Sequence, residues 1–113
     1  MSRICDVGDV PEGTARGFRL DPTDPGSLRV IVVRHAGEVR VYRNRCPHRG
    51  TPLDWAPDRF LDSSGEHLVC ATHGALFRIE DGHCVAGPCA GDALEQLSSA
   101  VEAGEVRIVE PVG

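Results

Sequence analysis

Two short segments, residues 46–50 (Cys-Pro-His-Arg-Gly) and 70–74 (Cys-Ala-Thr-His-Gly), constrain the fold of this 113-residue chain more than any other feature. The first supplies Cys46 and His48, and the second supplies Cys70 and His73. The thiol and the imidazole of one segment can turn toward one metal site only if the backbone between them bends tightly. A glycine ends each segment, and glycine permits such bends because it has no Cβ. The sequence therefore predicts a metal site formed by two loops.

A donor set of two cysteines and two histidines admits two interpretations. Zinc binds such a set tetrahedrally. Zinc fingers, however, usually pair cysteine with cysteine and histidine with histidine, whereas both segments here are mixed and nothing between them reads as a finger helix. The alternative is a [2Fe–2S] cluster with both cysteines on one iron and both histidines on the other. A zinc-stabilised binding module without redox activity stays open as the less favoured interpretation.

The motifs Cys-Pro-His-Arg-Gly-Thr-Pro-Leu at 46–53 and Cys-Ala-Thr-His-Gly-Ala-Leu-Phe at 70–77, with Ala-Gly-Pro at 86–88, resemble those of the Rieske family. Among its members, the chain is most similar to the small soluble ferredoxins. One departure is Ala71, where many members carry proline. A second is a slightly longer spacing between the two motifs, which predicts a surface excursion over residues 58–67.

The resemblance implies the ligands of the cluster. Carried over position by position, Cys46 and Cys70 would ligate one iron and His48 and His73 the other, with one [2Fe–2S] cluster per chain. Residues 86–89 would form a third loop beside it.

The resemblance also implies the function. Such ferredoxins are one-electron carriers rather than enzymes, and take electrons from a flavin reductase that uses NADH or NADPH and pass them to a terminal oxygenase. An alternative within the family is a small subunit of a larger oxidoreductase, similar to nitrite reductase small subunits. The chain has no Gly-x-Gly-x-x-Gly, Walker or Gly-x-Ser-x-Gly motif that would indicate another activity.

Charge and hydropathy narrow the class of partner. The net charge of -5 and the pI near 5.4 argue against a nucleic-acid-binding protein, which needs clustered basic residues. The longest aliphatic run, residues 30–33, is too short to cross a bilayer. We therefore expect transient protein partners, no membrane association and a cytoplasmic location, where thiols stay reduced.

The pattern of apolar residues and turn signals predicts an all-β fold, an antiparallel sandwich or barrel in one domain over residues 1–113. We expect a base from residues 1–45 and 90–113, and a cluster-binding subdomain of hairpin loops over residues 46–89. The expected strands lie at 2–7, 15–20, 28–34, 39–42, 67–70, 75–79, 83–85 and 105–109. Residues 94–101 could instead form one or two helical turns.

Ala75 bears on the reduction potential. High-potential Rieske proteins resemble one another in placing a serine after the second His-Gly, where its hydroxyl donates to a bridging sulfide. Alanine has no donor, so we expect a low potential within the Rieske range.

Several other apolar residues and two cysteines have expected places near the cluster or in the core. Leu53, Trp55, Leu76 and Pro88 could form an apolar rim near the histidine ligands, whereas Phe60 and Phe77 are expected in the core. Cys84 and Cys89 could approach each other across the third loop, but a cytosolic location favours two free thiols.

Overall fold

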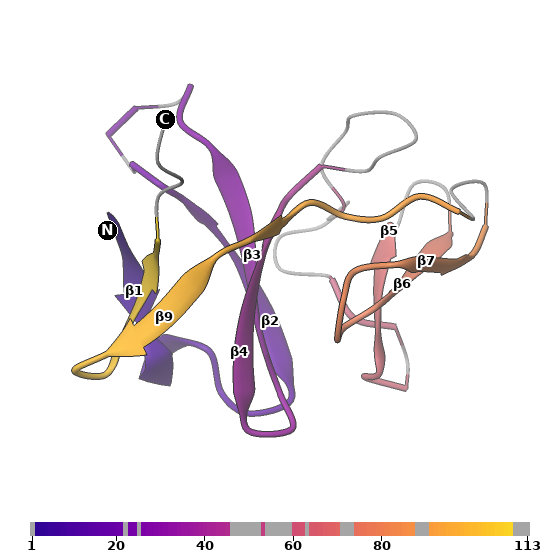
Figure 1. Ribbon diagram of the computed structural model, residues 1–113, viewed down its shortest axis with the longest axis horizontal. Helices are drawn as coiled ribbons and strands as arrows, with labels where there is room; N and C mark the ends of the chain where they lie inside the picture. Colours follow the sequence, from indigo (N-terminus) through magenta and orange to yellow (C-terminus); the bar gives the residue numbers. More distant parts are fainter. Residues whose placement is uncertain are drawn as a thin grey trace.

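The computed structural model describes residues 2–21, 23–24, 26–45, 53, 60–62, 64–70, 74–87 and 91–109. These residues form three antiparallel sheets and one short 3-10 turn, so the predicted all-β class is confirmed (Figure 1). The elements are β1 (Ser2–Asp6), η1 (Val7–Asp9), β2 (Thr14–Arg19), β3 (Arg29–His35), β4 (Glu38–Arg43), β5 (His67–Cys70), β6 (Ala75–Arg78), β7 (Cys84–Ala86), β8 (Gln96–Leu97), β9 (Ser99–Glu102) and β10 (Glu105–Ile108).

The largest sheet has the strand order β2-β3-β4-β8, and a second sheet has the order β1-β10-β9. β3 lies between β2 and β4, and its residues 30–33 are all buried. Ile31 faces a core shared with Phe77, whereas Val32 faces a separate core shared with Val106. The aliphatic run predicted to be a buried strand is therefore apolar on both faces because each face covers a different core.

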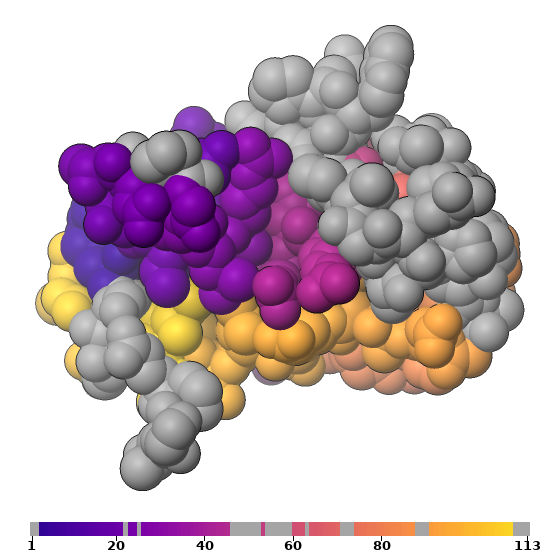
Figure 2. Space-filling view, turned by 90° about the horizontal axis from the view of Figure 1, so that it is seen from above, coloured from indigo at the N-terminus to yellow at the C-terminus, as the bar shows by residue number. Residues whose placement is uncertain are grey.

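The third sheet, with the order β5-β6-β7, lies beside the largest sheet, on the side opposite β1 and β9, and carries the second predicted ligand segment (Figure 1). Leu68, Phe77 and Ile79 are fully buried and share a core with Tyr42 of β4. Packing between the two sheets thus joins the β5–β6 hairpin, which contains the predicted ligand Cys70, to the largest sheet. Figure 2 looks onto the end of the molecule at which β3 begins and β4 ends.

Two expectations from the sequence are wrong. Residues 94–101 contain no helical turn, because Leu97 pairs with Val41 in one sheet and Ser99 pairs with Ile108 in another. The 58–67 segment is not simply a surface excursion in its described part. Phe60 is fully buried, as expected for a core residue, and its carbonyl accepts the Val69 N–H at 2.7 Å. This part of the segment packs against β5 because it contributes an aromatic ring to the core.

Candidate metal centre

The second ligand segment is the loop of a hairpin. Cys70 is the last residue of β5, pairs with Ala75 at the start of β6 and has 0% of its surface exposed. The Gly74 N–H donates to the Cys70 carbonyl at 2.7 Å, and Gly74 has a φ of +71°, as the predicted tight bend requires. The hairpin therefore places the Cys70 thiol in the core, at the base of a short loop. His73 belongs to that loop but lies outside the described residues, as do Cys46 and His48.

The first ligand segment is held at both of its ends. Asn44 follows β4 and is 8% exposed, and its Oδ1 accepts the Leu53 N–H at 2.8 Å. The Asn44 N–H donates to the Arg29 carbonyl at 2.9 Å, which fixes Asn44 to β3. Asn44 and Leu53, on either side of residues 45–52, therefore meet through one side chain. Sequence reasoning missed this role of Asn44, and its one signal is an amide side chain two residues before the predicted ligand Cys46.

Leu53 is not part of an exposed apolar rim, because it is fully buried and belongs to the core that contains Cys70. Leu76 is half-buried on β6. Trp55 and Pro88, the other two residues of the expected rim, lie outside the described residues. Leu53 is therefore a core residue.

The strand that leads toward the third loop is pressed against the ligand hairpin. Gly87 follows β7 with a φ of +94°, and a Cβ at this position would lie 2.8 Å from the Cα of Ala75. Only glycine fits such an approach, because 2.8 Å is inside van der Waals contact. Cys84 of β7 is buried with a free thiol, which donates to the Ala86 carbonyl at 3.2 Å. Cys89 lies outside the described residues.

Tyr42 connects the β5-β6-β7 sheet to the largest sheet. Its hydroxyl donates to the Ile79 carbonyl at 2.5 Å, and burial raises the pKa of Tyr42 to about 12. Nearby, the Leu94 N–H donates to the Gly82 carbonyl and the Cys84 N–H donates to the Asp92 carbonyl, both at 2.9 Å. Residues 92–94, which lead toward β8, are thereby bound to the β6–β7 hairpin.

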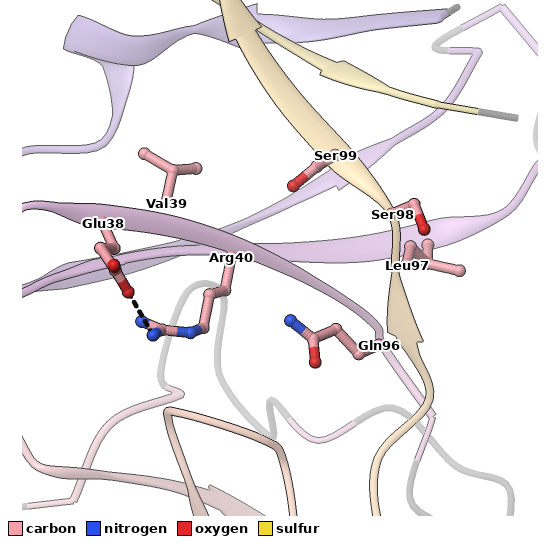
Figure 3. A pocket seen from close by; sticks show the side chains of 7 residues that line it. All are labelled: Glu38, Val39, Arg40, Gln96, Leu97, Ser98 and Ser99. Carbon is pink, nitrogen blue, oxygen red and sulfur yellow. Dashed lines mark hydrogen bonds and ion pairs between the residues drawn. The ribbon is translucent and has the colours of Figure 1, made fainter.

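One groove of about 640 Å³ lies between the start of β4 and the β8–β9 segment (Figure 3). Arg40 and Glu38 form an ion pair in it. The described residues that line this groove are Glu38, Val39, Arg40, Gln96, Leu97, Ser98 and Ser99. Cys70, the one predicted ligand that the structure describes, is not among them.

The described part of the centre fits an iron–sulfur cluster. Cys70 offers a sulfur donor that is shielded from water and held by hairpin hydrogen bonds, which suits a thiolate ligand. Its cross-strand partner Ala75 is also fully buried and has no side-chain donor. The described residues contain no helix that is long and apolar enough to cross a membrane.

The sequence matches the Rieske [2Fe-2S] domain over residues 1–106. It is 31% identical over 110 residues to the ferredoxin component of the alkene monooxygenase system of Xanthobacter autotrophicus, covering 96% of this chain and 81% of that protein. It is also 29% identical over 102 residues to the cytochrome b6-f complex iron-sulfur subunit of Chlorobaculum tepidum, covering 90% of this chain. In this second case the match spans 49% of the relative, about half its length.

The fold is similar to that of the ferredoxin of Sphingomonas yanoikuyae B1. The TM-score is 0.75 at 28% sequence identity, and the match covers 96% of this chain and 97% of that one. The similarity therefore extends over all three sheets. With a family match over almost its whole length, the chain belongs to the Rieske [2Fe-2S] domain family.

Proposed function

We propose that this chain is a one-electron carrier that holds one Rieske [2Fe–2S] cluster and serves as the ferredoxin component of an oxygenase system. The observation that carries the proposal is the buried Cys70 at the base of the β5–β6 hairpin, in a chain that matches the Rieske domain over residues 1–106. Bound there, such a cluster takes up and releases one electron at a potential raised by its histidine ligands.

The proposed ligands are Cys46 and Cys70 on one iron and His48 and His73 on the other. The chain supports this set by holding the ends of both segments: Asn44 ties the first segment to Leu53, and hairpin pairing closes the second. We further propose that residues 46–89 act as the cluster-binding subdomain on a base formed by 1–45 and 90–113. The separate β5-β6-β7 sheet supports this division.

The proposed partners are a flavin reductase that uses NADH or NADPH as electron donor and a terminal oxygenase as electron acceptor. The support is the relative named as the ferredoxin component of an alkene monooxygenase system, most of whose length this chain matches. In this role the chain carries an electron and leaves the chemistry on substrate to the oxygenase. A cytoplasmic location is proposed from the buried free thiols of Cys5 and Cys84, which suit a reducing compartment.

A visible absorption spectrum before and after dithionite, with iron, sulfide and zinc assayed on the same sample, tests the proposal. We expect a coloured protein that bleaches on reduction, with about two irons and two sulfides per chain. A colourless protein that holds one zinc would overturn the proposal in favour of a zinc-stabilised module.

Two cysteine variants sharpen this test. Cys70→Ser should lose the visible spectrum, because a hydroxyl is a poor replacement for a thiolate ligand. Cys84→Ser changes an equally buried thiol of β7 that is not a proposed ligand, and it should keep the spectrum. Loss of the spectrum in both variants would point to unfolding rather than ligation. If the chain elutes from size-exclusion chromatography in a stable stoichiometric complex with another protein, the alternative of a small subunit of a larger oxidoreductase is favoured.

A further inference from the structure

Charge is unevenly distributed along this acidic chain. Residues 14–45, which span β2 to β4, contain seven arginines and three acidic residues, for a net charge of +4. The rest of the chain contains five arginines and 14 acidic residues, for a net charge of -9. The positive charge of the chain is therefore concentrated in the segment from β2 to β4, although the total charge is -5.

Three of these arginines line a groove of about 420 Å³ where β3 begins and β4 ends. We call this the arginine groove, and its lining residues are Gly26, Ser27, Leu28, Arg29, Arg43, Asn44 and Arg45. It lies at the end of the molecule that Figure 2 faces. Arg45 immediately precedes the proposed ligand Cys46, so the groove adjoins the first ligand loop.

The backbone under the groove is held by hydrogen bonds between strands. Arg43 pairs with Val30 across β3 and β4, and its N–H donates to the Glu95 carbonyl at 2.9 Å. The Arg29 carbonyl accepts the Asn44 N–H, and the Arg45 N–H donates to the Arg43 carbonyl at 2.8 Å. Three positive charges are thus carried close together at well-fixed backbone positions.

The positive charge of the groove is largely uncompensated within the described residues. Arg29 and Arg45 are exposed and form no ion pair with a described carboxylate. Arg43 meets Glu95 only at 3.8 Å, with both side chains substantially exposed.

The acidic residues of the adjacent loop are engaged locally. Asp21 accepts hydrogen bonds from the Thr23 N–H and hydroxyl, and this contact lowers the pKa of Asp21. Asp24 accepts the Gly26 N–H. These two carboxylates are therefore held by hydrogen bonds within their own loop.

We propose that the arginine groove docks a carboxylate-rich surface of the protein that exchanges electrons with this chain. Guanidinium groups pair well with carboxylates because their planar donors match two acceptor oxygens. The negative remainder of the molecule repels the same acidic surface, so the charge distribution would orient the partner toward the groove during encounter. The proposal rests on the proposed electron-carrier function, because it places that partner beside the first ligand loop.

The test measures binding of fluorescein-labelled hexaglutamate to the purified holoprotein by fluorescence anisotropy, with labelled hexaglutamine as the uncharged control. Arg29→Gln/Arg45→Gln should weaken binding of hexaglutamate by about threefold to tenfold at low salt, as expected for the loss of two exposed charge contacts. The difference should shrink near about 0.2 M salt because screening shortens the range of the interaction. Arg29→Lys/Arg45→Lys, which keeps the charge, should retain most of the binding.

Arg3→Gln/Arg107→Gln is the matched control, since it removes the same charge from β1 and β10. Equal weakening by the two double variants would show that hexaglutamate senses only the net charge, and would overturn the proposal. Displacement of hexaglutamate by equimolar inorganic phosphate would also overturn it, because the groove would then be a small-anion site.

The visible spectrum of each sample keeps this inference separate from the proposed function. If all variants keep their visible spectra and the groove variants bind hexaglutamate no more weakly than the control variant, only the docking proposal is overturned. A protein without a cluster overturns the carrier function, whereas the binding assay needs no electron transfer and still reports on the groove.

Discussion

The hydroxyl of Tyr42 donates a hydrogen bond to the carbonyl of Ile79 at 2.5 Å, across 37 residues of sequence. Tyr42 belongs to β4 of the largest sheet, and Ile79 follows β6 of the β5-β6-β7 sheet. Both residues are fully buried. This single bond therefore links the sheet that holds Cys70 to the larger sheet beside it.

Replacing Tyr42 with phenylalanine should lower the free energy of unfolding by about 1–3 kcal/mol, because the Ile79 carbonyl would remain buried without this donor. Urea unfolding followed by far-UV circular dichroism measures the change. Tyr42→Leu should cost more, since it also removes part of the ring from the core. An unchanged unfolding midpoint in Tyr42→Phe would show that the bond does not contribute to stability.

The same residue should make the protein less stable at alkaline pH. Burial raises the pKa of Tyr42 from 10.0 to about 12, so ionisation is easier in the unfolded chain. The corresponding stability is complete below pH 10 and is lost as the pH rises toward 12. The free energies of unfolding of wild type and Tyr42→Phe, measured between pH 9 and 12, should therefore converge as the pH rises.

Two features make this pH test specific. The chain has one tyrosine, so tyrosinate absorbance reports the ionisation of Tyr42 directly. Burial also raises the pKa of Cys5 to about 11, so ionisation of this thiol at alkaline pH destabilises both proteins. This effect is the same in both proteins and cancels in the comparison. A tyrosinate titration centred near pH 10 in the folded protein would contradict the prediction.

Gly87→Ala should be strongly destabilising, whereas Gly91→Ala should not. Both glycines have a left-handed backbone, with φ of +94° and +98°. A Cβ at Gly87 would meet the Cα of Ala75 at 2.8 Å, but one at Gly91 would have no neighbour within 4 Å. We expect about 1 kcal/mol for Gly91→Ala from backbone strain alone, and about 2–4 kcal/mol for Gly87→Ala from strain plus overpacking. Similar melting temperatures for the two variants would show that the approach of β7 to Ala75 can relax.

Asn44→Ala should loosen the first ligand loop. The variant removes the acceptor for the buried Leu53 N–H and the side chain that joins the two ends of the loop. The visible spectrum should then fade several-fold faster in the presence of an iron chelator, with a loss of stability of about 1–3 kcal/mol. Asn44→Asp keeps an acceptor oxygen and should bleach more slowly than Asn44→Ala. Identical bleaching rates for wild type and Asn44→Ala would remove the loop-closing role.

Ala75→Ser should raise the reduction potential of the bound cluster. Ala75 is fully buried opposite Cys70, and a serine there could donate to a sulfur of the cluster. A hydrogen bond of about 1 kcal/mol corresponds to about 40 mV for a one-electron couple. Protein-film voltammetry of wild type and variant measures this shift, and Ala75→Val is a control that adds bulk without a donor. A shift of equal size in both variants would assign the effect to packing.

Several strands could be predicted from local pattern because their signals are local. The aliphatic run in β3, the turn that leads into β4, and the strand that ends at Cys70 all depend on residues close together in sequence. The prediction was wrong where distant partners decided. Within residues 94–101, β8 pairs with β4 and β9 pairs with β10, both of which are distant in sequence. Phe60 is buried because its ring packs in a core formed by other segments of the chain.

The sequence by itself determined the family and the second ligand segment's hairpin, since a short spacing of cysteine, histidine and glycine encodes a loop. Only the tertiary structure decided that Tyr42 reaches Ile79, that Asn44 joins Leu53, and that the arginines of two strands line one groove. Each of these depends on which strand faces which across the packed sheets. No local pattern encodes that choice, because burial of apolar surface drives packing without itself specifying the polar contacts that result.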